Sequence, residues 1–195
     1  MIRTVLVLPA PPALLSPRSA EDPVAELRTA CAAAVSTLPA RRPVVVLAAP
    51  VSEANAARGV TEPLGHRVAA HLLDGVPFEP QLALPYAAAG LLELDQPTTV
   101  IVMADGSARR GEKAPGHLHP DAVAFDERIE LALRSGDAEA LAALDPEVGE
   151  ELWCAGVPGL RVLGELARDR NVVAYLSYAD APFGVAWWVA RWDLS

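Results

Sequence analysis

The stretch TTVIVMADGSARRGEKAPGHL, residues 98–118, decides the fold class of this chain. Its first part, 98–103, is a run of β-branched and apolar residues typical of a strand that is buried on both faces. The loop that follows carries one carboxylate, one hydroxyl and three cations: Asp105, Ser107, Arg109, Arg110 and Lys113. Ligands of open α/β sheets bind beyond the carboxyl ends of the strands, so this loop is the first candidate for a functional site.

Two earlier apolar runs, 4–8 (TVLVL) and 44–49 (VVVLAA), have the same buried character. Between them, apolar residues recur at intervals of three and four, which predicts a helix over 22–38. Asp22 is the expected N-cap of this helix, and Pro23 suits its first position. A strand, a helix and a strand in this order form a right-handed crossover, so the two strands are predicted to be parallel.

The rest of the chain alternates predicted helices and loops before it ends in two strands. Helices are expected over four ranges: 82–94, 121–133, 138–144 and 158–168. Glycines and prolines interrupt 51–80, which indicates a long functional loop with one or two helical turns over 66–73. The β-rich runs 171–177 and 185–192 flank turn residues and predict an antiparallel hairpin at one end of the sheet.

These patterns predict a single α/β domain over residues 1–195, with a mainly parallel central sheet and helices on both faces. A hydrophobic fraction of 52% and a charged fraction of 21% exclude a disordered chain. No apolar run approaches the ~20 residues that a transmembrane helix needs. The opening residues 1–17 are similar to a signal peptide, but their short apolar run and prolines favour a first core strand in a cytoplasmic protein.

The charge and the cysteines narrow the classes of partner and site. A formal net charge of -9 disfavours nucleic acid and anionic membranes, because both select for clustered cations. Cys31 and Cys154 belong to no CxxC pair, so we expect two small core residues rather than a zinc site or a disulfide.

Three tryptophans lie in the last predicted strand. Alternation places Trp188 and Trp192 on one face of the sheet and Trp187 on the other. Large aromatic side chains dominate both cores and interfaces. We therefore expect core packing, with Trp187 marking a homodimer surface if its side chain projects away from the core.

Three segments, in order along nearly the whole chain, carry a family resemblance. They are 7–17 (VLPAPPALLSP), 104–129 (ADGSARRGEKAPGHLHPDAVAFDERI) and 178–192 (YADAPFGVAWWVARW). The first resembles an amino-terminal PHPP-L-P segment, the second a D-x-S-H-R segment followed by K-A-P and F-D, and the third a carboxyl-terminal hairpin. All three are features of the catalytic subunit of class III extradiol ring-cleavage dioxygenases (LigB-like) and its relatives, the MEMO proteins.

This resemblance implies a non-haem Fe(II) held by two histidines and a carboxylate, with open positions for a catechol and O2. The sequence departs at those positions. Ala10 replaces the first ligand histidine, 48–51 offers no second ligand, and Ala108 replaces the acid/base histidine. An alanine methyl neither binds a metal nor carries a proton. No metal site and no cofactor are therefore expected, and bound Fe(II) is the alternative.

The chain has four histidines: His66, His71, His117 and His119. The first two are five residues apart, which does not place them on one helical face, whereas the last two alternate in a loop. We expect surface or locally hydrogen-bonded side chains. A new metal site would require one of these pairs to converge with Asp105.

Parallel strands end at one edge of a sheet, and the turn of the hairpin is expected at the same edge. The residues predicted to line or border a crevice there are Ala10, Asp105, Ser107, Ala108, Arg109, Arg110, Lys113, Tyr178 and Asp180. Arginines recognise carboxylates and phosphates in a bidentate manner, so a small anion is the expected ligand. The same residues equally suit fold maintenance, because Asp and Ser favour turns and caps after strands and adjacent arginines commonly form surface ion pairs with acidic surroundings.

Three functions are compatible with these residues. The first is a divergent extradiol-dioxygenase-like protein without the iron site, which binds a small ligand, such as an anionic aromatic molecule, or a protein partner. The second is a hydrolase or lyase that reuses the pocket, and the third is an active Fe(II) dioxygenase, an oxidoreductase. The loss of ligands at each expected position favours the first two. A homo-oligomer is compatible with all three.

Overall fold

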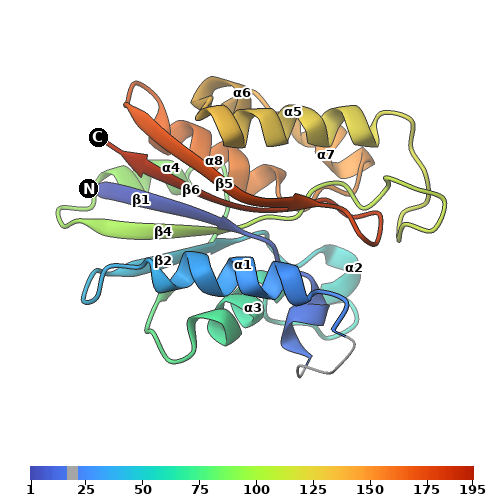
Figure 1. Cartoon of the computed structure of the whole chain (residues 1–195), viewed down its shortest axis with the longest axis horizontal. Coiled ribbons are helices and arrows are strands. Elements are labelled where there is room, and N and C mark those ends of the chain that lie inside the picture. Colours follow the sequence, from blue (N-terminus) through green and yellow to red (C-terminus); the bar gives the residue numbers. More distant parts are fainter. Residues whose placement is uncertain (17–21) are drawn as a thin grey trace.

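A six-stranded sheet with the order β3-β2-β4-β1-β6-β5 forms the centre of the computed structural model, which describes residues 1–16 and 22–195 (Figure 1). Its strands are β1 (Ile2–Leu8), β2 (Val44–Ala48), β3 (Glu79–Leu82), β4 (Thr98–Met103), β5 (Val172–Asp180) and β6 (Trp187–Leu194). The first four strands pair in parallel, whereas β6 is antiparallel to both β1 and β5. The predicted α/β class, mainly parallel sheet and antiparallel hairpin are confirmed. Pro17, the last residue of the segment 7–17, lies outside the described residues.

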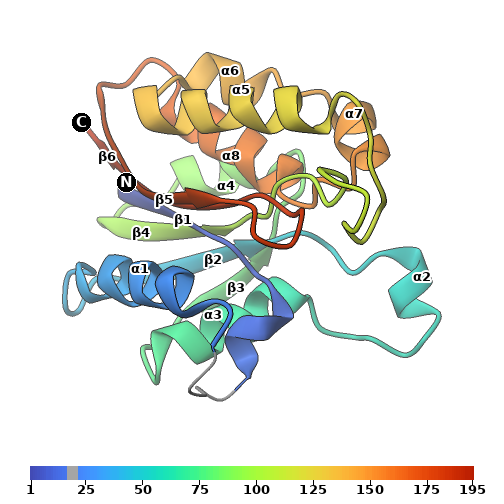
Figure 2. The same cartoon turned by 45° about the vertical axis from the view of Figure 1, so that its right-hand side comes forward.

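Helices cover both faces of the sheet (Figure 2). One side carries η1 (Pro12–Leu15), α1 (Ala25–Ser36), α2 (Glu53–Ala56) and α3 (Leu64–Leu73). The other side carries α4 (Ala87–Leu92), α5 (Ala122–Ser135), α6 (Ala138–Ala142), α7 (Pro146–Glu151) and α8 (Val157–Ala167). The strands β2 and β4 are buried along their whole length, as expected for central strands. Of the helices in the described ranges, none has the length and apolar character needed to cross a membrane.

The strand β6 divides its tryptophans between the two cores. Trp188 and Trp192 pack with α5 and α8, whereas Trp187 packs with α1. Trp192 also donates a hydrogen bond of 2.8 Å from Nε1 to the carbonyl oxygen of Leu133. The predicted alternation is confirmed. Trp187 is only 4% exposed, so it does not mark a homodimer surface.

The helix predicted over 22–38 begins later than the sequence indicates. It starts at Ala25, because the carboxylate of Asp22 accepts hydrogen bonds from the Val24 amide and the Arg28 guanidinium. Asp22 therefore closes the turn before α1 and is not its N-cap. Arg28 also donates to the carbonyl oxygen of Leu14, which ties α1 to the loop after β1.

The helix predicted over 82–94 is wrong in its first half. Elsewhere, one helix is longer than predicted and another was not predicted. Leu82 ends the strand β3, and only Ala87–Leu92 is helical. The proline within β3 conceals this strand in the sequence, because proline fits a sheet only at an edge, the position that β3 has. The turns expected near 66–73 form a ten-residue helix, and α7 has no predicted counterpart.

Cys31 and Cys154 are both buried free thiols, as predicted for core residues. Burial raises the pKa of Cys31 to about 12 and raises that of Cys154 as well. Thiols that ionise with such difficulty are poor nucleophiles. Neither cysteine is a candidate for chemistry.

Candidate functional site

Asp105 lies at the carboxyl end of β4 and joins three parts of the chain. Its Oδ1 accepts a hydrogen bond of 3.0 Å from the amide of Ala10, in the loop after β1. Its carbonyl oxygen accepts a hydrogen bond of 2.8 Å from Gly156, at the start of α8, and its backbone bridges to Trp187. Burial raises the pKa of Asp105 to about 6, against the opposing effect of the Ala10 amide. The expected convergence of strand ends at this edge is thus present for Ala10 and Asp105.

The residues at this edge do not fit a ferrous ion. The only acidic side chain of the predicted set that faces Ala10 is Asp105, and its Oδ1 is directed at an amide rather than at another metal ligand. At the end of β2, a Cβ built on Gly65 of α3 would lie 2.8 Å from the Cβ of Ala48 and 2.9 Å from that of Met103. Side-chain carbons of Ala48 and Met103 therefore fill the space beside Gly65. Within the described ranges, no group of three or more His, Cys, Asp or Glu side chains is arranged to hold a metal ion.

Ser107 is fully buried and holds the polar loop together from within. Its Oγ donates a hydrogen bond of 2.6 Å to the carbonyl oxygen of Leu152 and accepts one of 3.1 Å from the Arg109 amide. Its own amide donates to Oδ1 of Asp126 at 2.9 Å. A buried hydroxyl with both roles satisfied has a structural function and is closed to a ligand.

Both arginines of the loop bind groups of the same chain. Arg109 donates from Nε to the carbonyl oxygen of Gly116 and from Nη1 to that of Glu151, each at 2.9 Å. Nη1 of Arg110 lies 3.1 Å from Oδ2 of the buried Asp126. Burial raises the pKa of Asp126 to about 6, although the Ser107 amide and Arg110 act in the opposite direction. The arginines thus have the structural role that the alternative predicts, but Arg110 pairs with the buried Asp126 of α5 rather than at the surface, and Arg109 binds carbonyl oxygens.

The other predicted pocket residues are more dispersed. Ala108 is half-buried and Lys113 is exposed. Tyr178 lines a groove of about 550 Å3 between α1 and β5, which none of the residues from 105 to 113 line. Burial raises the pKa of Tyr178. Asp180 accepts a hydrogen bond from the amide of Ala181 in the hairpin turn. The structure therefore brings together the loop residues and Ala10, but assigns Tyr178 to a different groove.

The histidines do not form a common site. His66 is buried, and its Nε2 lies 3.2 Å from the carbonyl oxygen of Val46 and 3.0 Å from that of Gln81. His71 and His117 are exposed. His66 therefore joins β2 to β3, which corrects the expectation of a surface or purely local role for this residue.

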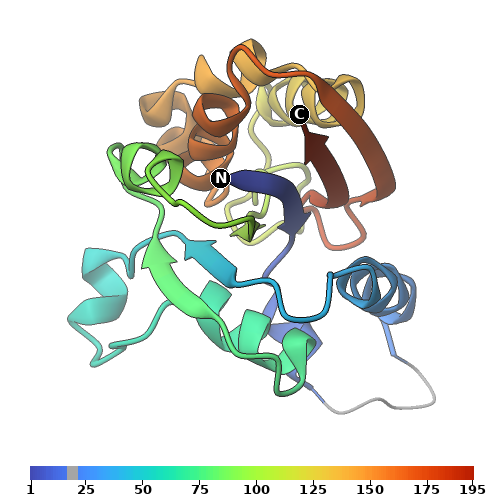
Figure 3. The ribbon, with the colours of Figure 1, turned by 90° about the vertical axis from the view of Figure 1, so that its left-hand side faces the viewer.

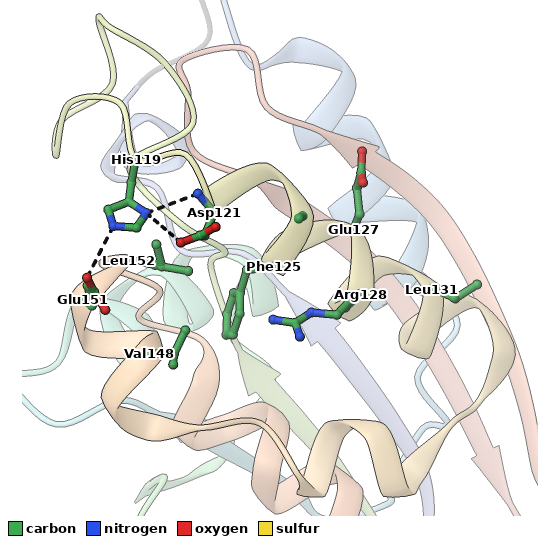
Figure 4. A pocket seen from close by; sticks show the side chains of 10 residues that line it. His119, Asp121, Phe125, Glu127, Arg128, Leu131, Val148, Glu151 and Leu152 are labelled. Atoms are coloured by element: carbon green, nitrogen blue, oxygen red, sulfur yellow. Dashed lines mark hydrogen bonds and ion pairs between the residues drawn. The ribbon is translucent and has the colours of Figure 1, made fainter.

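An open groove between α5 and α7 lies beside the polar loop (Figure 4). It has a volume of about 630 Å3 and is called the α5–α7 groove below. Its lining residues are His119, Asp121, Ala124, Phe125, Glu127, Arg128, Leu131, Val148, Glu151 and Leu152. The guanidinium carbon of Arg128 lies 5.4 Å from the centre of the Phe125 ring, a cation–π geometry. None of the residues proposed from the sequence as pocket candidates lines this groove.

His119 bridges the two walls of the α5–α7 groove. Its Nδ1 accepts a hydrogen bond of 3.3 Å from the Asp121 amide, at the start of α5, and its Nε2 lies 3.4 Å from Oε1 of Glu151, in α7. The polar loop supports the same walls. His119 donates its amide to the carbonyl oxygen of Arg109, while Ser107 and Arg109 bond to the backbone at the end of α7. Ser107 and Arg109 of the predicted loop thus fix the position of the groove walls through these hydrogen bonds.

The chain matches no protein-family model and no curated protein.

Proposed function

We propose that this chain is a divergent extradiol-dioxygenase-like protein that lacks the iron site and binds a small molecule in the α5–α7 groove. One observation carries the proposal: four polar side chains of the loop, those of Asp105, Ser107, Arg109 and Arg110, bond within the chain, and two of them support the α7 wall of the groove. Ser107 and Arg109 bind the carbonyl oxygens of Leu152 and Glu151. The two loop residues Ser107 and Arg109 therefore support the shape of a binding surface.

The lining of the groove favours a ligand with an apolar body and a cationic group. The accessible apolar surface comes from the half-buried Val148 and from Leu131, which is 65% exposed, above the buried Phe125 and Leu152. The rim carries three carboxylates, whereas Arg128 is its only permanent cation. The sequence predicts an anionic ligand on the premise that Arg109 and Arg110 are free to bind it. Because both guanidiniums bond within the chain, the three carboxylates of the rim favour a cationic ligand instead.

A thermal-shift titration with arylalkylamines tests this proposal. Binding to the native state raises the melting temperature by mass action, so we expect an increase that grows with amine concentration. A Leu131→Arg variant should lose this increase, because it removes apolar contact area and adds a cation at the groove. Leu92→Arg is the matched control, since Leu92 is an exposed helical leucine outside the groove, and it should respond like the wild type.

Aromatic carboxylates form the second arm of the same titration. They should leave the melting temperature unchanged at concentrations where the amines raise it. A response to carboxylates alone would contradict the proposal that the ligand is cationic. It would instead indicate that an anion binds to the loop arginines. Equal responses of the two leucine variants to the amines would exclude the α5–α7 groove as the binding site.

Reconstitution with Fe(II) tests the absence of the dioxygenase site. Protein incubated anaerobically with Fe(II) and then desalted is expected to retain iron well below one ion per chain, because alanines occupy the ligand positions. It should also consume no O2 with catechol or protocatechuate beyond a protein-free control. One tightly held iron per chain, together with substrate-dependent O2 uptake, would contradict the proposal.

A further inference from the structure

The two edges of the sheet differ in how they are protected against pairing with another strand. The edge strand β3 has only four residues and includes the exposed Glu79 and Pro80, which are typical blocks to further pairing. The opposite edge strand, β5, has nine residues. Its only charged residue is Asp180, at its end, and it contains no proline. Figure 3 shows β5 at the outer margin of the sheet, between α5 (yellow) and α1 (blue).

The hydrogen-bond pattern identifies which backbone groups of β5 face outward. Asn171 and Ser195 exchange both of their backbone hydrogen bonds, at 3.1 Å each. Because hydrogen-bonded pairs alternate in an antiparallel ladder, 173 and 175 also bond to β6, whereas 172, 174 and 176 direct their N–H and C=O groups away from it. A β-bulge between Leu176 and Tyr178 ends this regular spacing. The open edge therefore extends over 172–176.

The side chains of this open edge leave apolar surface exposed. Val173 is 53% exposed and Tyr175 is 57% exposed. The alternate residues, Val172, Ala174 and Leu176, pack against the core beneath α5. An uncharged edge with outward amides and two exposed apolar side chains is a template for strand addition.

We propose that β5 pairs with β5 of a second copy of this chain, antiparallel and about a twofold axis at Ala174. In this register the outward groups of residue 172 meet those of residue 176 in the second copy, and Ala174 meets Ala174. Val173 then lies opposite Tyr175 of the second copy, and Tyr175 opposite Val173. A β-branched residue facing an aromatic one in a non-hydrogen-bonded pair is a favourable cross-strand combination, and the twofold axis forms it twice.

A second copy fits this edge because the sequence of β5 is complementary to itself. The antiparallel arrangement puts the two Asp180 carboxylates at opposite ends of the paired strands, so no like charges face each other. The exposed Val173 and Tyr175 each supply the partner that the other needs. The two sheets would join into one continuous sheet, with α5 and α1 on either side of the seam.

Light scattering coupled to size exclusion, over a series of concentrations, tests this pairing. The wild type is expected to show twice the monomer mass at high concentration and to dissociate on dilution. Val173→Glu combined with Tyr175→Glu should be monomeric, because carboxylates would face each other twice across the seam. Val173→Glu combined with Tyr175→Lys is the matched control. It should remain dimeric at low salt, since each carboxylate then faces an ammonium group.

The control also tests the register. A wild type that is monomeric at every concentration, or a dimer that survives the two glutamates, would exclude β5 pairing. A monomeric Glu/Lys variant would exclude the register centred on Ala174. Both substituted positions, 173 and 175, are exposed, so circular dichroism should show unchanged folds. These outcomes do not depend on ligand binding in the α5–α7 groove.

Discussion

Replacement of Arg110 by alanine is expected to lower the free energy of unfolding by about 2–3 kcal/mol at about pH 8, where Asp126 is ionised. Asp126 is 1% exposed, and Arg110 is its only cationic partner among the described residues. The variant would leave a buried carboxylate without its counterion. The Ser107 amide would remain bonded to Oδ1, which limits the loss. Urea unfolding followed by circular dichroism measures the change.

The cause of this loss can be separated from lost packing by a second substitution. In an Asp126→Asn background, Arg110→Ala should cost less than about 1 kcal/mol, because no buried charge remains and the asparagine oxygen still accepts from Ser107. The penalty in the wild-type background should also shrink at about pH 5, since Asp126 has a raised pKa and takes up a proton. An equal penalty in both backgrounds would assign the effect to packing of the arginine stem.

The parts of the fold that follow a strict local pattern could be predicted from the sequence. β4 occupies 98–103 as predicted, because a run of six buried residues between polar loops has few other solutions. β3 was missed because it is short, exposed and contains a proline, so that only its edge position explains it. The helix α5 ends before Gly136, because this glycine adopts a positive φ of 75°, which few other residues tolerate.

The sequence predicted which loop residues meet at the carboxyl ends of the strands better than it predicted what their side chains bind. Asp105 does reach the loop after β1, as parallel topology requires. Arg109 was expected to meet a ligand, but it binds carbonyl oxygens of Gly116 and Glu151. Backbone acceptors are present at every position of a sequence, so no pattern reveals which of them a side chain will reach. The α5–α7 groove was missed because α7, which forms one wall, was not predicted.

Replacement of Asp105 by asparagine is expected to raise the free energy of unfolding by about 1–2 kcal/mol at about pH 8. Folding raises the pKa of this carboxyl from 3.8 to about 6, mainly through burial, so the ionised form is destabilised in the native protein. This difference corresponds to at most about 3 kcal/mol. The asparagine oxygen can still accept the Ala10 hydrogen bond, but its amide group needs a new partner, which reduces the gain.

The raised pKa determines how the stabilisation by Asp105→Asn depends on pH. A raised pKa means that the folded protein binds the proton more tightly than the unfolded chain does. The stability contributed by protonated Asp105 is therefore fully present below about pH 4 and is lost as the pH rises through about 6. The difference between variant and wild type should grow over this window in urea unfolding. Asp180→Asn is the control, because this exposed aspartate also accepts a backbone amide, and its replacement should change stability by less than about 0.5 kcal/mol at any pH. A difference between Asp105→Asn and the wild type that stays constant from about pH 4 to 8 would show that Asp105 does not hold its proton in the folded state.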